Sequence, residues 1–440
     1  MARPSICVVG TGYVGMATMI GLAQLGYGVR GYDILGDRIE RLQRGIPPYR
    51  EAGIEALLRE HLAAGRLSFF AELADAACDA ELIVIAVGTP TRDDGSADLS
   101  GLHDAIEQLV AVPFEGWPTV AVRSTVPPGT CDRLATVVEE FGELIYAPEF
   151  LREGSAVADF LSPDRIVVGA RSPAAAVPYV RLFETLEKPV VLTSRTNAEL
   201  IKCCSNAFLA LKISFANEVA NLCDVLGATS DDVLRGVGYD RRIGTQFLRP
   251  GIGFGGPCFE KDVRSIVHVA STHDVGRELF SATLRVNATQ PRRIVEMIER
   301  DLGRLAGRTL GIWGLAFKAG TDDVRDSLAL RIVRELGERG ATMLAYDPAV
   351  RLAPLPAGCR LVADPLAACD ADALLVLTEW PQFRAVDPSE VAERLRLGVV
   401  VDGRNILDPA RYEAAGLLYR GVGRPRRTRI EEPAAMMSVL

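Results

Sequence analysis

Short runs of consecutive apolar residues, separated by helical patterns and turn residues, recur along the first third of the chain. Residues 6–9 form the first run, residues 13–25 carry apolar side chains at helical spacing, and a second run covers residues 29–32. Further runs lie at 82–87, 119–122 and 144–146. Runs of this kind, bounded by turn residues, are typical of strands buried on both faces of a parallel sheet. The pattern therefore predicts an α/β fold.

Residues 196–227 follow a different pattern. Apolar residues recur three and four positions apart, and the segment has no proline and no glycine before Gly227. We therefore expect one helix of about 32 residues, which would be about 48 Å long. Such a helix is longer than one domain needs. We expect it to connect two halves of the chain and to pack against a second copy of the protein in a homodimer.

The strand–helix–strand pattern then returns in a degenerate form. It comprises a strand and turn at 308–318, a helix at 326–340, and strands at 342–347, 373–380 and 398–405. Alternation of strands and helices predicts a parallel sheet with helices on both faces. The sequence as a whole thus predicts an α/β protein with two Rossmann-like, doubly wound domains joined by a long central helix.

Composition and charge exclude several classes of protein. The chain has 440 residues, too many for one hydrophobic core, and its net charge of −8 argues against nucleic acid as a partner. The first residues lead directly into a strand, and no apolar run is long enough to span a membrane. The nine cysteines are scattered without a CxxC pair, so we expect no disulfide framework and no metal site. These features favour a reduced, cytoplasmic protein without a membrane partner.

The first predicted turn carries the motif G-x-G-x-x-G, formed by Gly10, Gly12 and Gly15 with Tyr13 and Val14 between them. The glycines would allow a tight turn, close approach of a pyrophosphate, and packing of helix on strand. The helix N-terminus would stabilise the phosphate charge.

An acidic residue, Asp33, ends the next strand, 18 residues after Gly15. There it would bind a ribose diol and repel a 2′-phosphate, which predicts NAD rather than NADP as the cofactor. Arg38 follows on the next helix, where it is either a contact to the ribose or phosphate or a solvated helix residue.

Ligands in such folds lie beyond the carboxyl ends of the strands. There the chain places GTPT (88–91), RSTVPPGT (123–130) and YAPEFLREG (146–154), with the hydroxyls of Thr89 and Thr125. Two Rossmann-like domains suggest two nucleotide-containing ligands, of which NAD is one. We predict an NAD-binding domain at 1–195, a central helical and dimerisation domain at 196–300, a second Rossmann-like domain at 301–420 that binds the second nucleotide-containing ligand, and a tail at 421–440.

A glycine-rich loop, GFGGPCFEKD (253–262), surrounds one cysteine, Cys258. A cysteine kept for packing usually has apolar neighbours on a helix or strand. Oxidation of an alcohol to a ketone needs no nucleophile, whereas oxidation of an aldehyde to an acid benefits from a thiolate that adds to the carbonyl. Lys202 and Lys261 are candidates for the charge that would lower the pKa of this thiol. The four histidines lie outside all motif-like segments, so acid–base chemistry must rely on Lys, Asp, Glu or Cys.

These motifs, in this order, resemble those of the nucleotide-sugar 6-dehydrogenases, a family that includes UDP-glucose and GDP-mannose 6-dehydrogenases. The resemblance covers about residues 5–410 and rests on VGTGYVG, AVGTPT, STVPPGT, PEFLREG, the ELIK…NAF helix, RRIG…GIGFGGPCFEKDV, GLAFKAGTDDVRDS and VDGRN. It implies a four-electron oxidation of the C6 hydroxyl of a nucleotide sugar to the uronic acid, with two NAD⁺ and one water.

The resemblance also implies roles for individual residues. Cys258 is similar to the covalent nucleophile, Glu149 to the carboxylate that handles the hydrolytic water, and Thr125 to a residue that supports a water. Lys202 and Asn206 resemble the pair that holds and stabilises the C6 oxygen. They lie four residues apart, hence on one helix face; without the resemblance they would be read as a solvated pair. Asp262 resembles an aspartate that works with an ordered water near the lysine.

Other positions match the two binding sites of the family. For the cofactor, in addition to the glycine motif and Asp33, these are Arg38, Thr89, Thr125, Glu153, Lys261 and Arg325. For the nucleotide sugar, they are Glu149, Phe150, Leu151, Arg152, Glu153, Lys202, Asn206, Phe247, Leu248, Arg249, Pro250, Gly251, Gly255, Lys318, Arg404 and, from the partner subunit, Arg242.

Two residues depart from the family pattern around the cysteine. Pro257 replaces a small hydroxyl residue, which removes a side-chain hydroxyl and a backbone N–H beside Cys258. Glu260 replaces a proline and brings a negative charge close to the thiol. We still expect catalysis, although both changes act on the thiol.

The substrate is less well defined by sequence. RRIGTQFL (241–248) resembles the UDP-glucose enzymes, whereas LRPG followed by KDVRSI favours the GDP-mannose branch. We expect UDP-glucose, with GDP-mannose, UDP-N-acetylhexosamines and dTDP-glucose as alternatives. A two-electron hydroxyacid dehydrogenase and a non-catalytic NAD-binding regulatory module are rivals of other classes, but neither would use Cys258 or the second Rossmann-like domain.

Overall fold

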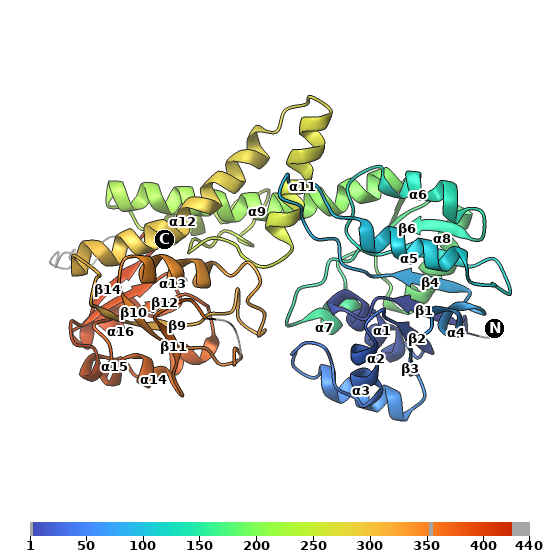
Figure 1. Cartoon of the computed structure of the whole chain (residues 1–440). Helices are drawn as coiled ribbons and strands as arrows, with labels where there is room; N and C mark the ends of the chain where they lie inside the picture. The colour runs from blue at the N-terminus through green and yellow to red at the C-terminus, as the bar shows by residue number, and fades with distance from the viewer. Residues whose placement is uncertain (1–2, 352–354, 425–440) are drawn as a thin grey trace, which may run out of the picture. The chain divides into compact units, whose positions relative to one another are not determined.

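The computed structural model describes residues 3–351 and 355–424. Contacts divide the chain into two compact units. Unit 1 contains the chain up to Phe208, together with Cys258–Ser281 and Gly320–Asp322; unit 2 contains Leu209–Pro257, Ala282–Ala319 and the chain from Asp323 onward. Each unit is built on one sheet (Figure 1).

The sheet of unit 1 has eight strands in the order β3-β2-β1-β4-β5-β6-β7-β8. The first six follow the strand order of a dinucleotide-binding fold, and all of their pairings are parallel. The pair β6–β7 is antiparallel, through Tyr146 and Gly169. The strands are β1 (Ile6–Val9), β2 (Val29–Tyr32), β3 (Leu67–Phe70), β4 (Leu82–Ile85), β5 (Thr119–Val122), β6 (Glu143–Tyr146), β7 (Ile166–Gly169) and β8 (Val190–Thr193).

Alternate strand residues of this sheet enter two different cores. Ile6 and Val8 of β1 pack on one face, and Cys7 and Val9 pack on the other. On the first face lie α1 (Tyr13–Gln24), α2 (Gly36–Gln43), α3 (Ile54–Ala63), α7 (Ala156–Leu161) and α8 (Pro173–Val180), followed by η1 (Arg181–Leu186). On the second face lie α4 (Leu73–Ala77), α5 (Ser100–Val110) and α6 (Thr130–Val138). Because both faces are covered, central strands such as β1 and β4 are apolar throughout, which is the pattern that the sequence shows, whereas β8 at the edge is partly exposed.

Helix α9 spans Arg195–Leu226, within one residue of the predicted bounds. Its first part belongs to unit 1 and the part from Leu209 belongs to unit 2. The helix exposes several large apolar side chains, among them Phe208, Phe215 and Leu222, which are 61%, 45% and 58% exposed. Unit 1 also contains α11 (Phe259–Thr272) and the first turn of α12 (Glu278–Leu302).

The sheet of unit 2 has six parallel strands in the order β11-β10-β9-β12-β13-β14, which repeats the order of the first six strands of unit 1. The strands are β9 (Thr309–Trp313), β10 (Thr342–Tyr346), β11 (Cys359–Leu361), β12 (Ala373–Val376), β13 (Val399–Asp402) and β14 (Leu418–Gly421). The helices are α10 (Ser230–Gly238), α13 (Leu328–Glu338), α14 (Pro365–Ala368), η2 (Pro381–Ala385), α15 (Pro388–Arg394) and α16 (Pro409–Ala414). In its core the buried Trp313 ring stacks on Phe383, with 5.0 Å between ring centroids.

The predicted fold class, two doubly wound domains with a long helix between them in sequence, is confirmed. The exact domain boundaries stay a prediction. Of the predicted tail, Val422 is buried in unit 2 and Arg424 pairs with Asp231 at 2.7 Å, whereas residues 425–440 lie outside the described residues.

Candidate active site

The glycine loop after β1 has the backbone that a pyrophosphate site needs. Gly10 has φ +95°, and a Cβ there would lie 2.7 Å from the carbonyl oxygen of Ala86. A Cβ on Gly15 would lie 1.8 Å from the carbonyl oxygen of Gly10. At Gly12, by contrast, a Cβ would meet nothing within 4 Å. Gly10 and Gly15 are thus required by the fold, whereas the open space at Gly12, before the N-terminus of α1, fits a dinucleotide phosphate.

Asp33 lies at the end of β2, buried, and is held as an acceptor. Its Oδ2 accepts hydrogen bonds from the backbone N–H and the hydroxyl of Thr11 at 2.8 and 2.9 Å, and it pairs with Arg38 Nη1 at 2.8 Å. Burial raises the pKa of Asp33, but hydrogen bonds from Thr11, Leu35 and Arg38 outweigh it, and the net pKa lies below the usual value. An ionised carboxylate at this position fits the ribose diol of NAD. The Arg38 guanidinium thus forms an ion pair with Asp33, and its role as a cofactor contact stays a prediction.

Four of the predicted catalytic side chains meet in unit 1. Lys202 and Asn206 point into the protein from one face of α9 and are 3% and 7% exposed. Lys202 Nζ lies 3.1 Å from Glu149 Oε1, and Asn206 Nδ2 donates to Asp262 Oδ2 at 2.6 Å. The helical spacing of the first two residues brings the second two, from distant parts of the chain, to the same face.

The charges of this cluster are balanced. Lys261 Nζ lies 2.8 Å from Asp262 Oδ1, so two lysines face two carboxylates. Burial lowers the pKa of Lys202, but Glu149 and Asp262 raise it by more, so its net pKa is above the usual value. Lys202 is therefore a fixed positive charge at neutral pH. It fits the stabilisation of an alkoxide-like oxygen better than the role of a free base.

Cys258 immediately precedes α11, which carries Lys261 and Asp262. The residue keeps surface open to solvent, yet protein atoms surround the thiol closely enough to desolvate it. This desolvation and the Glu149 charge raise the pKa of Cys258 to about 12, although Lys202 and Lys261 act to lower it. Lys202 and Lys261 thus lower the pKa of the thiol, as predicted, but burial and two carboxylates outweigh them and the net pKa is raised. The thiol is therefore protonated at neutral pH.

Of the two departures from the family pattern, Glu260 lies one turn before Arg264, whose Nη1 is 3.9 Å from Glu260 Oε1. The groups that most shift the pKa of Cys258 are Glu149, Lys202, Asp262 and Lys261, after burial itself. The expected influence of Glu260 on the thiol is thus smaller than that of the catalytic carboxylates.

The loops after β5 and β6 contain the other catalytic candidates. The hydroxyl of Thr89 donates to the carbonyl oxygen of Thr125 at 2.7 Å, which joins the GTPT and STVPPGT loops. Glu149 Oε2 accepts from the backbone N–H of Leu151 at 2.5 Å, so the loop fixes the orientation of its own carboxylate. Phe150 lies between two cations: the Arg165 guanidinium is 3.7 Å from its ring centroid and Lys202 Nζ is 5.2 Å away.

A buried carboxylate on α9, Glu199, is a residue that sequence reasoning missed. It is 0% exposed and accepts from the backbone N–H groups of Gly129 and Cys131 at 2.5 and 2.7 Å, at the N-terminus of α6. Since Glu199 lies one turn before Lys202, this cap anchors the STVPPGT loop to the catalytic part of α9. In the sequence, the only indication of a role for Glu199 was its position one turn before Lys202.

In unit 2, two asparagines hold the segment that leads to the cysteine. Asn217 Oδ1 accepts from the backbone N–H of Gly251 at 2.7 Å, and Asn287 bonds both the N–H and the carbonyl of Phe254, at 2.8 and 2.9 Å. Both asparagines are buried. The sequence did not indicate their role, because a single asparagine within a helix belongs to no recognisable motif.

The glycines before Cys258 are explained by packing within unit 2. A Cβ on Gly255 would lie 2.7 Å from the carbonyl oxygen of Asp326, and one on Gly256 would lie 2.6 Å from the ring of Phe317. Phe247, which has φ +63°, is one of the non-glycine residues with a left-handed backbone. The glycines therefore allow close packing of this segment against other residues of unit 2.

The remaining predicted ligand residues of unit 2 have partners of their own. The Arg404 guanidinium donates to the carbonyl oxygens of Leu377, Gly253 and Phe317 at 2.9, 3.2 and 3.1 Å. Arg325 pairs with Asp323 at 2.5 Å, and the highly exposed Arg242 pairs with Asp240 at 2.6 Å. Lys318 Nζ lies 5.7 Å from the ring centroid of Phe317. Their roles as cofactor or substrate ligands stay predictions.

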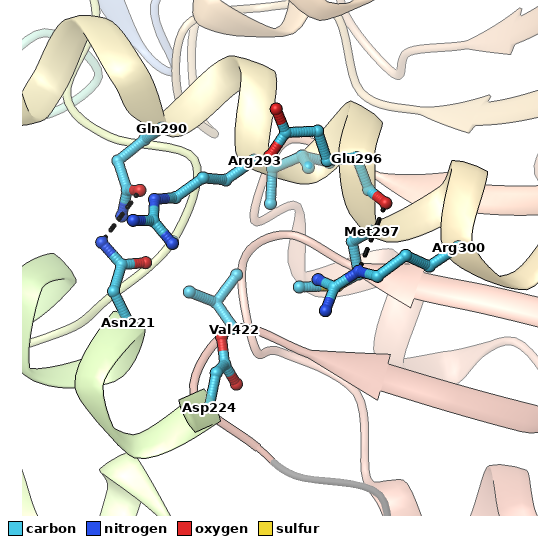
Figure 2. A pocket seen from close by; sticks show the side chains of 10 residues that line it. Asn221, Asp224, Gln290, Arg293, Glu296, Met297, Arg300 and Val422 are labelled. Carbon is cyan, nitrogen blue, oxygen red and sulfur yellow. Dashed lines mark hydrogen bonds between the residues drawn. The ribbon is translucent and has the colours of Figure 1, made fainter. Parts of the chain in front are cut away.

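A small polar pocket of unit 2 lies next to Gly251, between α9, α12 and Val422. Figure 2 shows Arg293 and Arg300 of α12 on one side and Asn221 and Asp224 of α9 on the other. Its cavity of about 40 Å³ can hold a water, but it is far below the volume of a nucleotide site. The pocket is thus no candidate for the sugar-nucleotide site.

Within the described part of the chain, no group of histidine, cysteine or carboxylate side chains could hold a metal ion. Among the described helices, none is both long and apolar enough to cross a membrane. The nine cysteines are free thiols.

Comparison with known proteins identifies the domains. Residues 4–187 match the NAD binding domain of the UDP-glucose/GDP-mannose dehydrogenase family, residues 196–289 match its central domain, and residues 311–409 match its UDP binding domain. The use of NAD, predicted from the glycine loop and Asp33, agrees with the first of these matches.

Relatives of full length are similar throughout. A UDP-glucose 6-dehydrogenase of Pseudomonas aeruginosa is 41% identical over 98% of this chain and 100% of its own. One from Rhizobium meliloti is 38% identical over 96% of this chain and 99% of its own. Among solved structures, a UDP-glucose dehydrogenase from Pyrobaculum islandicum has a TM-score of 0.89 and 40% identity, covering 96% of this chain and 98% of that one. The chain belongs to the UDP-glucose/GDP-mannose dehydrogenase family.

Proposed function

We propose that this protein is an NAD-dependent UDP-glucose 6-dehydrogenase that converts UDP-glucose, two NAD⁺ and one water into UDP-glucuronate and two NADH. The observation that supports this most directly is the buried cluster of Glu149, Lys202, Asn206 and Asp262 in unit 1, with Cys258 one turn before Asp262. The cluster contains a nucleophile, a fixed cation and two carboxylates, which a four-electron oxidation requires. Two curated relatives of full length carry the same activity in their names.

The first half of the reaction uses the cluster without the thiol. The C6 hydroxyl binds between Lys202 and Asn206, where the Lys202 charge stabilises the oxygen as its proton leaves to a water held by Asp262. NAD⁺ held by the glycine loop and Asp33 would supply the hydride acceptor in each half of the reaction. The product of this half is an aldehyde that stays in the site.

The second half uses Cys258. Its sulfur bonds to C6 of the aldehyde and the thiol proton passes to the aldehyde oxygen, which gives a thiohemiacetal. Loss of a hydride from C6, and of the hydroxyl proton to the water held by Asp262, yields a thioester. Glu149 then takes a proton from a second water as the oxygen of that water bonds to C6. The C6–sulfur bond breaks and the proton passes from Glu149 to the sulfur, which releases the uronic acid and restores the thiol.

We further propose a homodimer that forms through α9. Phe208, Phe215 and Leu222 are exposed at intervals of seven residues, the spacing of a seam along a helix that packs against another helix. Exposed apolar stripes of this kind mark interaction surfaces. In such a dimer, the highly exposed Arg242 would be available to the site of the partner. A reduced, cytoplasmic location also stays a proposal.

The competing substrates are other nucleotide sugars. A GDP-mannose dehydrogenase structure from Pseudomonas aeruginosa is 27% identical with a TM-score of 0.53, and a UDP-N-acetylmannosamine dehydrogenase structure from Pyrococcus horikoshii is 28% identical with a TM-score of 0.85. Both are less similar than the UDP-glucose relatives, and this difference supports UDP-glucose.

The test is a panel of UDP-glucose, GDP-mannose, dTDP-glucose and UDP-N-acetylhexosamines, with NADH counted per sugar consumed. Two NADH per UDP-glucose, with kcat/KM at least about tenfold above the others, is the expected result. One NADH per sugar would indicate a two-electron dehydrogenase, and none with any sugar would indicate a binding module.

A further inference from the structure

The cofactor loop and the catalytic loop are joined by a buried carboxylate that belongs to neither. Glu51 lies in the connection between α2 and α3, far from both loops in sequence, and is 8% exposed. Its Oε2 accepts from the Tyr13 hydroxyl at 2.5 Å and from the backbone N–H of Gly154 at 3.0 Å, and its Oε1 accepts from the N–H of Ala156 at 2.8 Å. All of these residues lie in unit 1.

A carboxylate buried in this way needs compensation for the loss of water. Within the described residues, no arginine or lysine pairs with Glu51, and its two carboxylate oxygens are satisfied by the three hydrogen bonds. Hydrogen bonds to a charged acceptor are stronger than neutral ones, and an unpaired buried charge would be costly. Removal of any one of the three donors therefore leaves the Glu51 side chain less firmly held.

One of the three donors lies in the glycine motif. Tyr13 is the first residue of α1, directly after Gly12, and its ring packs on Tyr49 with 4.5 Å between centroids. The hydroxyl also lies 3.1 Å from the carbonyl oxygen of Arg152, in the catalytic loop. Burial and the hydrogen bond to Glu51 raise the pKa of Tyr13, so the hydroxyl keeps its proton and acts as a donor.

The other two donors lie in the loop that contains Glu149. Gly154 and Ala156 are at the end of this loop and the start of α7, and Glu149 itself is oriented by the N–H of Leu151 in the same loop. A path of direct contacts thus leads from the phosphate end of the cofactor site, through Tyr13 and Glu51, to the loop that holds the carboxylate for thioester hydrolysis.

We propose that Glu51 is a positioning residue that couples occupation of the glycine loop by NAD⁺ to the ordering of the catalytic loop, residues 149–156. The inference rests on the proposed function, because it assigns the glycine loop to NAD⁺. A pyrophosphate bound at Gly12 and Tyr13 fixes the start of α1, and the Tyr13 hydroxyl then holds Glu51 in place to bind the loop amides. In an enzyme that must reduce two NAD⁺ per sugar, such coupling lets the loop loosen when the first NADH leaves and tighten when the second NAD⁺ arrives.

The alternative is that Glu51 only caps α7. A cap would stabilise the loop equally with and without the cofactor. Removal of the Tyr13 hydroxyl would then change exchange of the loop by the same factor with and without NAD⁺. Hydrogen–deuterium exchange of the peptide that covers residues 150–157, with and without NAD⁺, separates the two cases without any need for turnover.

In the wild-type protein, NAD⁺ is expected to slow exchange at Gly154 and Ala156 by about tenfold, within the usual range of coupling between sites. In Tyr13→Phe, which keeps the ring and its packing, and in Glu51→Gln, which replaces one acceptor oxygen by a donor, the slowing should fall below about threefold. Calorimetry should show that the affinity for NAD⁺ falls, relative to wild type, by the same factor by which the slowing of exchange falls in each variant. Glu55→Gln, a change at an exposed residue of α3 that pairs only with Arg59, should behave as wild type.

If NAD⁺ binds to the wild type by calorimetry but protects the loop equally in wild type, Tyr13→Phe and Glu51→Gln, the coupling is refuted and Glu51 is only a cap. Binding without any protection in the wild type refutes it as well. If NAD⁺ does not bind to the wild type at all, the proposed function fails, and this inference fails with it. Should Glu51→Gln not fold, Tyr13→Phe decides the matter alone, since it leaves the buried carboxylate and the loop amides in place.

Discussion

At the scale of single residues, the proposed chemistry depends on the protonation of Cys258. Its pKa of about 12 contrasts with an ordinary value of 9.0, because the thiol is desolvated and faces Glu149. A protonated resting thiol is protected from oxidation, since the thiolate is the reactive form. The thiol must then lose its proton during the proposed reaction. In the proposed mechanism the acceptor of this proton is the aldehyde oxygen beside Lys202.

This arrangement predicts the pH dependence of alkylation of Cys258 by iodoacetamide. Because the folded-state pKa lies near 12, the thiolate fraction should rise about tenfold per pH unit from pH 8 to 10 without levelling off, whereas an ordinary thiol levels off above 9. Mass spectrometry of the Cys258 peptide measures the rate. Glu149→Gln should shift the profile to lower pH, since it removes the carboxylate that raises the pKa most. A plateau near pH 9 in the wild type would contradict this account.

Replacement of the nucleophile should separate the two halves of the reaction. Cys258→Ser should lose at least about a thousandfold in steady-state turnover and accumulate a sugar ester, because a hydroxyl is much less acidic than a thiol and its ester is hydrolysed slowly. Cys258→Ala should form no adduct. Both are checked by intact-protein mass and by NADH yield.

The hydrolytic step has its own variant. Glu149→Gln should accumulate a thioester on Cys258, seen as a mass increase that hydroxylamine removes, because the carboxylate that activates water is gone. Uronic acid production by Cys258→Ala at a rate near that of wild type would disprove the nucleophile assignment.

Asp33 should set the preference between cofactors. Since the Thr11 and Arg38 contacts hold its pKa below the usual range, it is ionised at neutral pH and repels a 2′-phosphate. We expect kcat/KM for NAD⁺ to exceed that for NADP⁺ by at least about tenfold, and Asp33→Asn to reduce the ratio. Equal values in the wild type would point to Arg38 as a phosphate ligand instead.

At the scale of elements, α9 has two separate tasks on its different faces. One face presents Lys202 and Asn206 to the buried cluster, and Glu199 on the same stretch anchors the loop before α6. Another face exposes the apolar stripe that includes Phe208, Phe215 and Leu222. A single rigid helix can therefore align catalytic residues and present an interface at once.

The interface proposal predicts that Phe215→Glu weakens dimerisation by at least about thirtyfold, the factor expected for loss of a central contact. Sedimentation or light scattering over a range of concentrations measures it. Val137→Glu changes an equally exposed apolar residue on α6 (41% against 45%) and should leave the dimer intact. An active wild-type monomer at assay concentration would rule out the dimer.

At the scale of the whole molecule, the six strands of the unit 2 sheet repeat the order of the first six strands of the unit 1 sheet, and the candidate sites are distributed over both units. Unit 1 has the glycine loop and the catalytic cluster, and unit 2 has the segment at 247–251 that resembles a nucleotide-sugar grip. The division falls between Pro257 and Cys258, so the cysteine belongs with Lys202 and Asp262, while the glycines before it pack within unit 2.

The sequence by itself determined the repeating units. Most of the central strands, the order of motifs and α9 could be read directly, because buried parallel strands and long helices impose local patterns of apolar residues. The sequence did not predict β3, β7, β8, β11 and β14. The candidate catalytic residues were predicted because their motifs resemble those of a known family. Lys202 and Asn206, for example, gave no more than a helical spacing until that resemblance was considered.

Only the tertiary structure revealed the supporting polar residues and the charge balance. Glu51, Glu199, Asn217 and Asn287 each bind backbone groups 33 to 105 residues away in sequence, so no local pattern could show their partners. The raised pKa of Cys258 likewise depends on burial and on Glu149, which folding brings near from over a hundred residues away. Hydrogen bonding and desolvation are properties of positions in space, and the sequence fixes them only through the fold.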